Sequence, residues 1–185
     1  DWPGKMRIKH KDKKFLGDDQ PVIAVTWYDA MAYCLWLTLM MAAQGGSAQL
    51  KDAKVFYRLP HEKEWEWAAG CEPDGSLRDY PWPKDKGGPS DKLANYGNNV
   101  GVTTAVGRYP DGATPEGLLD MAGNVWEWQS NLYSAGGAAR ALRGGAWNSL
   151  EDYLRCSARV SFLPDGYWHA AGFRVVLAES HFLAL

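Results

Sequence analysis

The chain has few cysteines, few histidines and almost no excess charge, and each shortage excludes a class of protein. Its 185 residues include three cysteines and four histidines, and the formal net charge is −2. The odd number of thiols excludes full internal pairing, and no Cys-x-x-Cys is present to hold a metal. The charge balance gives no whole-chain attraction to nucleic acid or to an anionic membrane. We expect buried or idle thiols at Cys34, Cys71 and Cys156, with one disulfide as the alternative.

Long apolar runs are also missing. The most apolar stretch, residues 31–43, is shorter than the ~18 residues of a membrane span, so we expect no membrane span in this chain. No signal peptide is visible, and the chain begins with Asp1 instead of Met. We interpret the sequence as a fragment of a longer protein, so localisation signals can lie outside it. The basic run from Lys5 to Lys14 is interpreted as a solvated segment, with a binding arm as the alternative.

Large rings and turn formers are abundant. Ten tryptophans, 20 glycines and 10 prolines favour a loop-rich fold that is held by aromatic packing. Residues 71–117 are rich in Gly, Pro, Asn and Asp, which favours a long functional or ion-stiffened loop. The length is that of one domain, and it can bury a core without cross-links.

The first half of the chain shows a strand followed by a helix. Residues 21–25 are predicted to form a short strand. Thr26 then caps a helix, with Asp29 approximating a capping box, and the apolar residues that follow keep helical spacing up to Gly45.

A second helix and three further strands are predicted. A strand at 55–57 leads into a helix from His61 to Ala69, which Gly70 ends. Glu62, Glu64 and Glu66 are interpreted as capping and surface groups, with a catalytic acid–base pair as the alternative. The remaining strands are expected at 142–146 and 173–177.

Five motifs in a fixed order carry a family resemblance. They are VTWYDAMAYCLWL (25–37), YRLPHEKEWEWAA (57–69), GLLDMAGNVWEW (117–128), LRGGAW (142–147) and CSAR…PDG…AGFRVV (156–176). The sequence resembles the formylglycine-generating-enzyme, or sulfatase-modifying factor, family over about residues 21–177. The resemblance implies an α+β, loop-rich, C-type lectin-like fold of the formylglycine-generating-enzyme subtype. We expect one such domain at 21–185, after a charged segment at 1–20 that is a truncated or divergent start.

The resemblance implies copper chemistry only where two particular cysteines are present. The oxygenase of the family holds copper(I) with thiolates, because soft ligands select that ion. Ser149 stands at one of these positions, and residues 151–154 contain no cysteine for the other. The histidines show no metal-ligand spacing, and no phosphate-binding, dinucleotide or nucleophile-elbow motif occurs. We therefore expect no copper and no enzyme activity.

The resemblance also implies calcium, which requires hard oxygen ligands. Carried over residue by residue, a first structural site would use Asp120, the carbonyls of Gly123 and Val125, and Glu127. A second, weaker site would use Asn95, the carbonyl of Tyr96, Asn98 and the carbonyl of Val100. The alternative is that these side chains tie the loops together by hydrogen bonds.

The segment 148–171 resembles the variable region of proteins diversified by a retroelement. In such proteins a frame of Arg, Gly and aromatic residues surrounds clustered replaceable positions, and adenine-rich codons supply the variation. The frame here would be Arg143, Gly144, Gly145, Trp147, Arg155, Arg159, Gly172, Phe173 and Arg174. The replaceable, ligand-binding positions would be Asn148, Ser149, Leu150, Asp152, Tyr153, Val160, Ser161, Phe162, Leu163, Gly166, Tyr167, Trp168, His169 and Ala170.

The sequence therefore favours a non-catalytic domain whose replaceable residues form an exposed patch. Tyr, Trp, Phe and Leu on a rigid platform suit recognition of a protein or cell-surface ligand. The partners we expect include no nucleic acid, and the expected place is a cell surface or a virion surface. Two alternatives remain open: an accessory module of fixed specificity, and an oxidoreductase of the family. The oligomeric state is not predicted.

Overall fold

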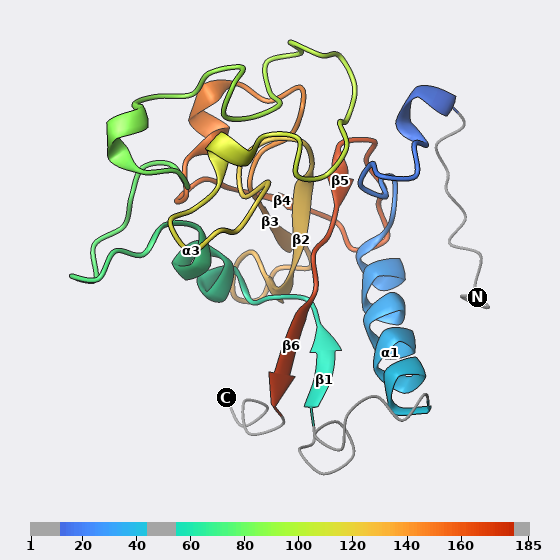
Figure 1. Cartoon of the computed structure of the whole chain (residues 1–185). Coiled ribbons are helices and arrows are strands. Elements are labelled where there is room, and N and C mark those ends of the chain that lie inside the picture. The colour runs from blue at the N-terminus through green and yellow to red at the C-terminus, as the bar shows by residue number, and fades with distance from the viewer. Residues whose placement is uncertain (1–11, 44–54, 180–185) are drawn as a thin grey trace.

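The computed structural model describes residues 12–43 and 55–179. The predictions for most of the basic run, for the helix end at Gly45, and for His10 and His181 lie outside these residues. Within the described residues the chain forms two helices, six short strands and four 3-10 turns, and the helices are labelled in Figure 1. The elements are η1 (Lys13–Phe15), α1 (Trp27–Ala43), β1 (Val55–Arg58), α3 (Glu62–Gly70), η2 (Lys84–Lys86), η3 (Pro110–Gly112), β2 (Trp126–Leu132), β3 (Arg140–Arg143), η4 (Glu151–Leu154), β4 (Arg159–Phe162), β5 (Ala171–Gly172) and β6 (Val176–Glu179).

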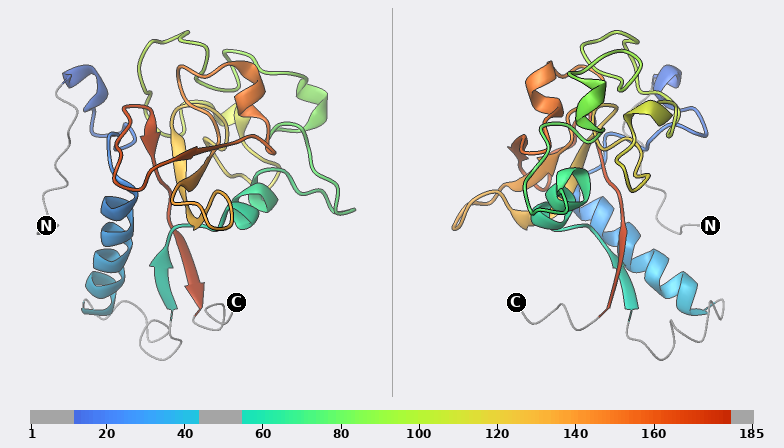
Figure 2. Two further views of the ribbon diagram at one scale, coloured as in Figure 1. Left: turned by 180° about the vertical axis from the view of Figure 1, so that it is seen from behind. Right: turned by 60° about the vertical axis from the view of Figure 1, so that its left-hand side comes forward.

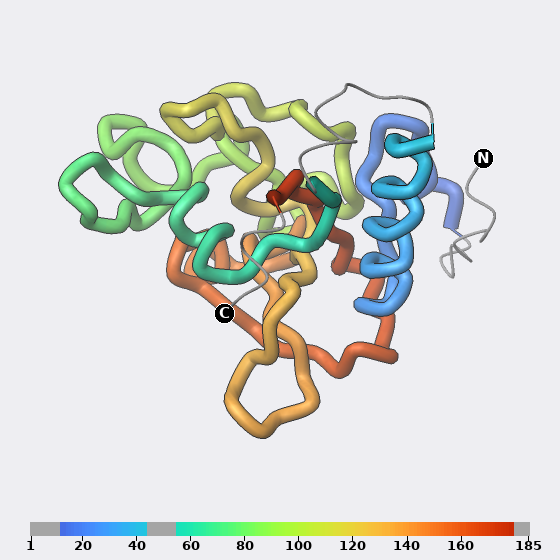
Figure 3. Tube along the Cα trace, turned by 90° about the horizontal axis from the view of Figure 1, so that it is seen from below, coloured from blue at the N-terminus to red at the C-terminus, as the bar shows by residue number. Residues whose placement is uncertain are grey.

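Two small sheets organise the molecule. The larger has the order β4-β3-β2-β5, with β2 and β5 parallel and the other pairs antiparallel. The smaller is the antiparallel pair of β1 and β6, which lies beside α1 in Figures 1 and 2. The turn between β2 and β3 projects from the body, as Figure 3 shows. The core lies between the larger sheet and α1, and it includes the buried rings of Trp126 and Trp128.

Helix α1 begins as the capping pattern predicts. The Thr26 hydroxyl accepts a hydrogen bond from the Asp29 amide (3.0 Å), and the Asp29 carboxylate accepts one from the Thr26 amide (2.9 Å). The helix buries Ala30 and Cys34 against the core. Among the described residues, no helix is both long and apolar enough to cross a bilayer.

Helix α3 also begins with a capping box. The His61 side chain accepts from the Lys63 amide (3.1 Å), and the Glu64 carboxylate accepts from the His61 amide (2.7 Å). Trp65 and Ala69 face inward, while Lys63 and Glu64 face solvent. The predicted helix is therefore confirmed to within one residue at its C-terminal end.

Three of the predicted strands differ from the structure. Residues 21–25 are not a strand: Ala24 has a φ of 56°, and its amide donates to the carbonyl of Trp168 (3.2 Å). The strand expected at 142–146 is β3, which ends at Arg143 because the next two residues, both glycine, have positive φ. The strand expected at 173–177 is replaced by β5 and β6 with an irregular link between them.

The long loop 71–117 contains little regular structure beyond the short turns η2 and η3, and hydrogen bonds to side chains help to order it. The side-chain amide of Asn124 donates to the Thr104 carbonyl (3.2 Å), and its oxygen accepts from the Thr104 amide (3.0 Å). The indole of Trp82 donates to the Gly87 carbonyl (2.9 Å). These bonds satisfy buried polar groups, and they place the loop against the frame of the domain.

Residues 12–20 pack against the same core. The buried ring of Phe15 lies 5.6 Å from that of Trp147, and the Gln20 amide donates to the Thr103 carbonyl (2.5 Å). Residues 12–20, which the sequence analysis assigned to the charged N-terminal segment, therefore pack as part of the domain.

Candidate functional site

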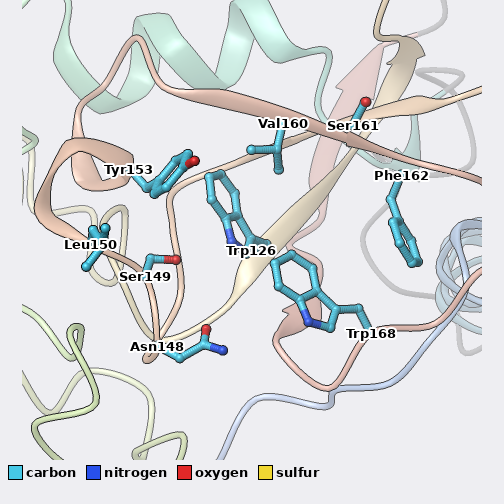
Figure 4. A pocket seen from close by; sticks show the side chains of 9 residues that line it. All are labelled: Trp126, Asn148, Ser149, Leu150, Tyr153, Val160, Ser161, Phe162 and Trp168. Atoms are coloured by element: carbon cyan, nitrogen blue, oxygen red, sulfur yellow. The ribbon is translucent and has the colours of Figure 1, made fainter.

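A pocket of about 450 Å³ opens in the segment that the sequence marks as replaceable. Figure 4 shows its side chains, which come from β2, η4, β4, the loop between β3 and η4, and the loop after β4. The lining residues are Trp126, Asn148, Ser149, Leu150, Tyr153, Val160, Ser161, Phe162 and Trp168. None of these carries a formal charge, so the pocket suits a neutral, mostly apolar group.

Aromatic rings form the walls of this pocket. The ring of Tyr153 stands edge-on to Trp126, with centroids 5.7 Å apart. The ring of Phe162 lies 6.3 Å from Trp168 and 6.2 Å from Trp128. Trp126 is buried in β2, so one wall belongs to the frame and the others to the replaceable segment. The sequence prediction omitted Trp126, which lies about twenty positions before the replaceable segment and reaches it only through the fold.

Eight of the fourteen predicted ligand-binding residues line this pocket, and we call the whole predicted set the 148–170 surface. Half-buried members are Asn148, Val160, Gly166 and Trp168. The exposed members are Leu150, Asp152, Tyr153, Ser161, Phe162, Leu163, Tyr167 and His169.

Two predicted members of that surface are buried. Ala170 is 0% exposed and lies in the main core, where its carbonyl accepts from the Trp126 amide (2.8 Å). The prediction that Ala170 contacts a ligand is therefore wrong. Ser149 is 8% exposed, and its hydroxyl accepts from the Ala146 amide (2.9 Å). Ser149 lines the pocket, but its hydroxyl holds the backbone of the Gly-Gly turn.

Two arginines, the buried Arg143 and the half-buried Arg159, hold the backbone beneath this surface. Arg143 is 1% exposed and donates to the carbonyls of Cys156 (3.1 Å) and Ala158 (3.3 Å). Arg159 donates to the Tyr133 carbonyl (2.7 Å) and lies 4.0 Å from the centre of the Tyr133 ring. The prediction that buried arginines donate hydrogen bonds to loop carbonyls is confirmed at Arg143, whereas Arg159 donates to such a carbonyl but is half-buried.

Arg155 differs from that prediction. Its guanidinium donates to the Asp79 carboxylate (2.7 Å) and is partly exposed.

Glu62 is the counter-charge for this arginine pair, which the sequence analysis missed. Its carboxylate accepts from Arg159 at 2.8 and 2.7 Å and from Arg143 at 3.1 Å. It also accepts from the Asn131 side chain (3.0 Å). Glu62 is buried, so the prediction of a surface group is wrong at this position. The helix dipole favours a carboxylate in the first turn whether that carboxylate is exposed or buried, so its position in the helix did not reveal the burial of Glu62.

The first predicted calcium site holds an ion pair. Glu127 accepts from Arg174 at 2.6 and 2.7 Å and from the Trp65 indole at 2.7 Å. Arg174 also donates to the Asp120 carbonyl (3.1 Å). In this arrangement a guanidinium already neutralises Glu127, so the residues as placed do not fit a calcium ion.

Asp120 lies next to this ion pair. Its carboxylate accepts from the Gly107 amide (2.6 Å). Burial raises the pKa of the Asp120 carboxyl above its ordinary value; the Gly107 amide and Arg174 oppose that shift, and Glu127 adds to it.

The second predicted calcium site has one acceptor without a donor. The Asn95 side-chain nitrogen donates to the Val102 carbonyl (2.8 Å), while its buried oxygen accepts no hydrogen bond within the described residues. The Tyr96 carbonyl accepts from the Asn99 amide (3.0 Å), and Asn98 and Val100 are exposed. The Asn95 oxygen fits a hard cation. Within residues 12–43 and 55–179, no three His, Cys, Asp or Glu side chains gather as a metal site.

All three thiols are free, as one of the two sequence alternatives predicts. Burial raises the pKa of Cys34 to about 11 and that of Cys156 to about 12. Because the thiolate is the nucleophile and the metal ligand, these two cysteines are poorly reactive at neutral pH.

With this geometry established, comparison with known proteins identifies the family. The model of the Sulfatase-modifying factor enzyme 1-like domain matches residues 3–179. The chain belongs to this family.

The relatives carry names that refer to different activities. The chain is 38% identical over 172 residues to serine/threonine-protein kinase pkn1 of Chlamydia caviae, covering 83% of this chain and 23% of that protein. It is 33% identical over 174 residues to hercynine oxygenase of Mycobacterium tuberculosis, covering 84% and 36%. It is 32% identical over 171 residues to inactive C-alpha-formylglycine-generating enzyme 2 of Bos taurus, covering 83% and 49%. The chain spans less than half the length of each of these relatives.

Solved structures confirm the fold. Treponema denticola variable protein 1 is 28% identical with a TM-score of 0.67, covering 85% of this chain and 70% of that chain. The P3c variant of the major tropism determinant has a TM-score of 0.51 at 15% identity, which shows the fold alone, and covers 91% and 42%. The predicted α+β, C-type lectin-like fold and the resemblance to a variable protein are confirmed.

Proposed function

We propose that the chain is a non-catalytic ligand-binding domain whose 148–170 surface recognises a protein or cell-surface ligand. The observation that carries this proposal is the pocket of about 450 Å³, which is walled by exposed or half-exposed rings of the segment. Its neutral lining favours a large apolar or aromatic group of the ligand, seated between Tyr153, Trp126 and Trp168.

The rigid frame supports this proposal energetically. Binding costs less when the binding residues are already ordered, and the backbone beneath the surface is fixed by Arg143, Arg159 and Glu62. Large exposed side chains such as Leu150 (71% exposed) and Tyr167 (55%) then lie ready to be buried by a partner.

The placement of side chains also supports diversification of the segment. Exposed side chains such as Leu163 and His169 can change identity without opening a cavity in the core. Ser149 and Ala170 are the exceptions, because their side chains are buried. We expect a near-identical, adenine-rich repeat of the codons for 148–170 in the neighbouring DNA, beside a reverse-transcriptase gene. Sequencing that region tests this part, and absence of the repeat would leave a module of fixed specificity.

The thiols support the non-catalytic part of the proposal. Ser149 stands where the family resemblance places a copper-binding cysteine, and Cys156 is buried with a raised pKa. A relative named as inactive agrees with this, whereas the hercynine oxygenase relative is an enzyme. Measuring copper(I) binding and oxygen consumption with a cysteine-containing peptide tests the oxidoreductase alternative, and we expect neither.

A displayed random-peptide library tests binding by the 148–170 surface. Peptides selected on the wild-type chain are expected to share a large apolar residue and to lose binding to the double variant Leu150→Ser, Tyr153→Ser. The variant Leu132→Ser, on β2 and outside the surface, is the matched control and should bind as the wild type does. Peptides that bind both variants equally would contradict the proposal. A ligand on cells or virions would agree with the proposed location at such a surface.

A further inference from the structure

The indole of Trp126 is a buried hydrogen-bond donor without an acceptor. Trp126 is 2% exposed, and no residue in the described part of the chain accepts a hydrogen bond from its indole nitrogen. Buried indole N–H groups usually find a partner. Three other buried tryptophans follow that rule with hydrogen bonds of 2.7, 2.9 and 3.1 Å, and they are Trp65, Trp82 and Trp128. The Trp126 donor therefore remains available to a ligand.

This donor belongs to the pocket of the 148–170 surface. Trp126 is one of the lining residues, and Figure 4 shows its indole nitrogen on the edge of the ring toward Ser149. Trp147 also lacks an acceptor for its indole nitrogen, but that nitrogen is completely covered and Trp147 lies outside the pocket lining. A ligand that displaces solvent from a hydrogen-bond donor loses affinity unless it replaces the bond. A group that fills this pocket must therefore bring an acceptor to Trp126.

The acceptor has to be neutral. The lining carries no formal charge, so a carboxylate in the pocket would lose its hydration without gaining a counter-charge. The polar side chains that the lining does offer are Asn148, Ser149 and Ser161. Within the described residues, Asn148 and Ser161 have no hydrogen-bond partner for their side chains. The Asn148 amide can both donate and accept, so it can serve a group that is itself donor and acceptor.

The walls favour an aromatic ring as the carrier of that acceptor. The rings of Tyr153, Phe162 and Trp168 line the pocket, and aromatic pairs gain from edge-on and offset contacts. Phenylalanine and leucine fill such a space but leave the indole N–H unpaired, and tryptophan is a donor only. Histidine carries an acceptor but gains charge near neutral pH. Tyrosine is the side chain that combines a large neutral ring with an oxygen that accepts.

We propose that the pocket binds a tyrosine side chain of a protein partner, whose phenol oxygen accepts a hydrogen bond from the Trp126 indole. This inference rests on the proposed function, because it names the group that the same pocket recognises. It also divides the labour within the site. Trp126 belongs to β2 and to the frame, so the preference for a phenol persists when the replaceable residues around it change.

Three neutral probes that differ only in the side chain test the inference. They are N-acetyl-tyrosinamide, N-acetyl-phenylalaninamide and N-acetyl-leucinamide, each titrated into the ¹⁵N-labelled chain while the indole N–H signals are followed by NMR. The tyrosine probe is expected to bind roughly 10-fold more tightly than the other two, which is the effect of one added hydrogen bond to a buried donor. It should also move the Trp126 indole signal in the direction of a stronger hydrogen bond.

Two substitutions separate the hydrogen bond from the packing. Trp126→Phe keeps a ring but removes the N–H, and it should bring the affinities for the tyrosine and phenylalanine probes to within about 2-fold of each other. Trp82→Phe removes a buried indole outside the pocket and is the matched control, which should keep the preference for tyrosine. Thermal melting of both variants checks that they fold, and the comparison of probes on the wild type does not depend on either.

Equal binding of the three probes, or binding of the tyrosine probe that leaves the Trp126 indole signal unmoved, would overturn the inference and leave the proposed function standing. Absence of any shift in signals of the lining residues would also overturn it. The proposed function is tested separately, by the selected peptides and the Leu150→Ser, Tyr153→Ser variant, and it fails only if those peptides bind elsewhere.

Discussion

Glu62 accepts two hydrogen bonds from Arg159, at 2.8 and 2.7 Å, and so links α3 to β4. Strand β4 carries Val160, Ser161 and Phe162 into the pocket, directly after Arg159. Glu62, which is 97 positions from Arg159 in the sequence, therefore holds the strand that forms one wall of the pocket.

Glu62→Gln should destabilise the fold. The substitution leaves Arg159 without its carboxylate and leaves the buried Arg143 with only its longer pair to Glu66 (3.4 Å), and removing one partner of a buried ion pair costs roughly 3 kcal/mol. Urea unfolding measures the loss. Glu64→Gln is the control: its pair with Arg58 is more exposed and Gln preserves the capping box, so less than about 1 kcal/mol is expected. Equal losses in the two variants would contradict the assigned role of Glu62.

Asp120 should make stability depend on pH. Burial raises the pKa of its carboxyl in the folded state, so the folded state binds a proton more readily than the unfolded state. The contribution of this group is therefore fully present below the ordinary Asp pKa and is lost as the pH rises through the raised value. Melting temperatures of wild type and Asp120→Asn across that window test this. The melting temperature of Asp120→Asn should rise relative to that of the wild type as the pH rises. Two melting curves that stay parallel across the window would contradict a raised pKa of Asp120.

Replacing Arg174 should allow calcium to bind at the first predicted site, the one around Asp120 and Glu127. Its guanidinium occupies both Glu127 oxygens, so Arg174→Gln frees a carboxylate for a cation. Added Ca²⁺ should therefore raise the melting temperature of Arg174→Gln more than that of the wild type, because a ligand stabilises the state that binds it. Adding Asp120→Asn to the variant should remove the effect. A rise of the same size in wild type and Arg174→Gln would instead point to the second site, around Asn95.

Gly123 should tolerate alanine far less well than Gly136. Both glycines have positive φ, at 76° and 75°, so each alanine costs about 1 kcal/mol in backbone conformation. A Cβ on Gly123 would lie 2.3 Å from the Asn95 carbonyl oxygen, whereas one on Gly136 meets nothing within 4 Å. We expect Gly123→Ala to lose roughly 2 kcal/mol more than Gly136→Ala in chemical denaturation. Similar losses would show that the loop around Asn95 can move aside.

The sequence predicted elements whose signals are local. The start of α1 at Thr26 and the start of α3 at His61 both depend on contacts within four residues, and both are confirmed. The strand expected at 21–25 failed because its backbone bond goes to Trp168, far along the chain, and because Ala24 takes a left-handed conformation. Neither the distant hydrogen bond nor the left-handed backbone can be deduced from a local run of strand-forming residues.

The candidate site also combines residues that local sequence predicts with residues that only distant contacts place. Clustered aromatic and aliphatic residues without helical or strand periodicity predicted exposed side chains such as Tyr153 and Tyr167, and those are exposed. Ala170 and Glu62 were misplaced because burial of a small or charged residue depends on what packs over it from distant segments. Only the assembled sheet brings Trp126 beneath Tyr153.

Strand β2 pairs with β3 on one side and with β5 on the other, and Glu127 is opposite Arg143 in the first pair and Gly172 in the second. The whole segment between Arg143 and Gly172 thus departs from and returns to the two flanks of a single residue, about 10 Å apart by the spacing of strands. The entropic cost of closing such a gap grows only slowly with the length of the segment between its ends. The segment can therefore lengthen at its exposed turns while both ends stay beside Glu127, provided that the buried Ala170 and the contact of Arg159 with Glu62 are kept.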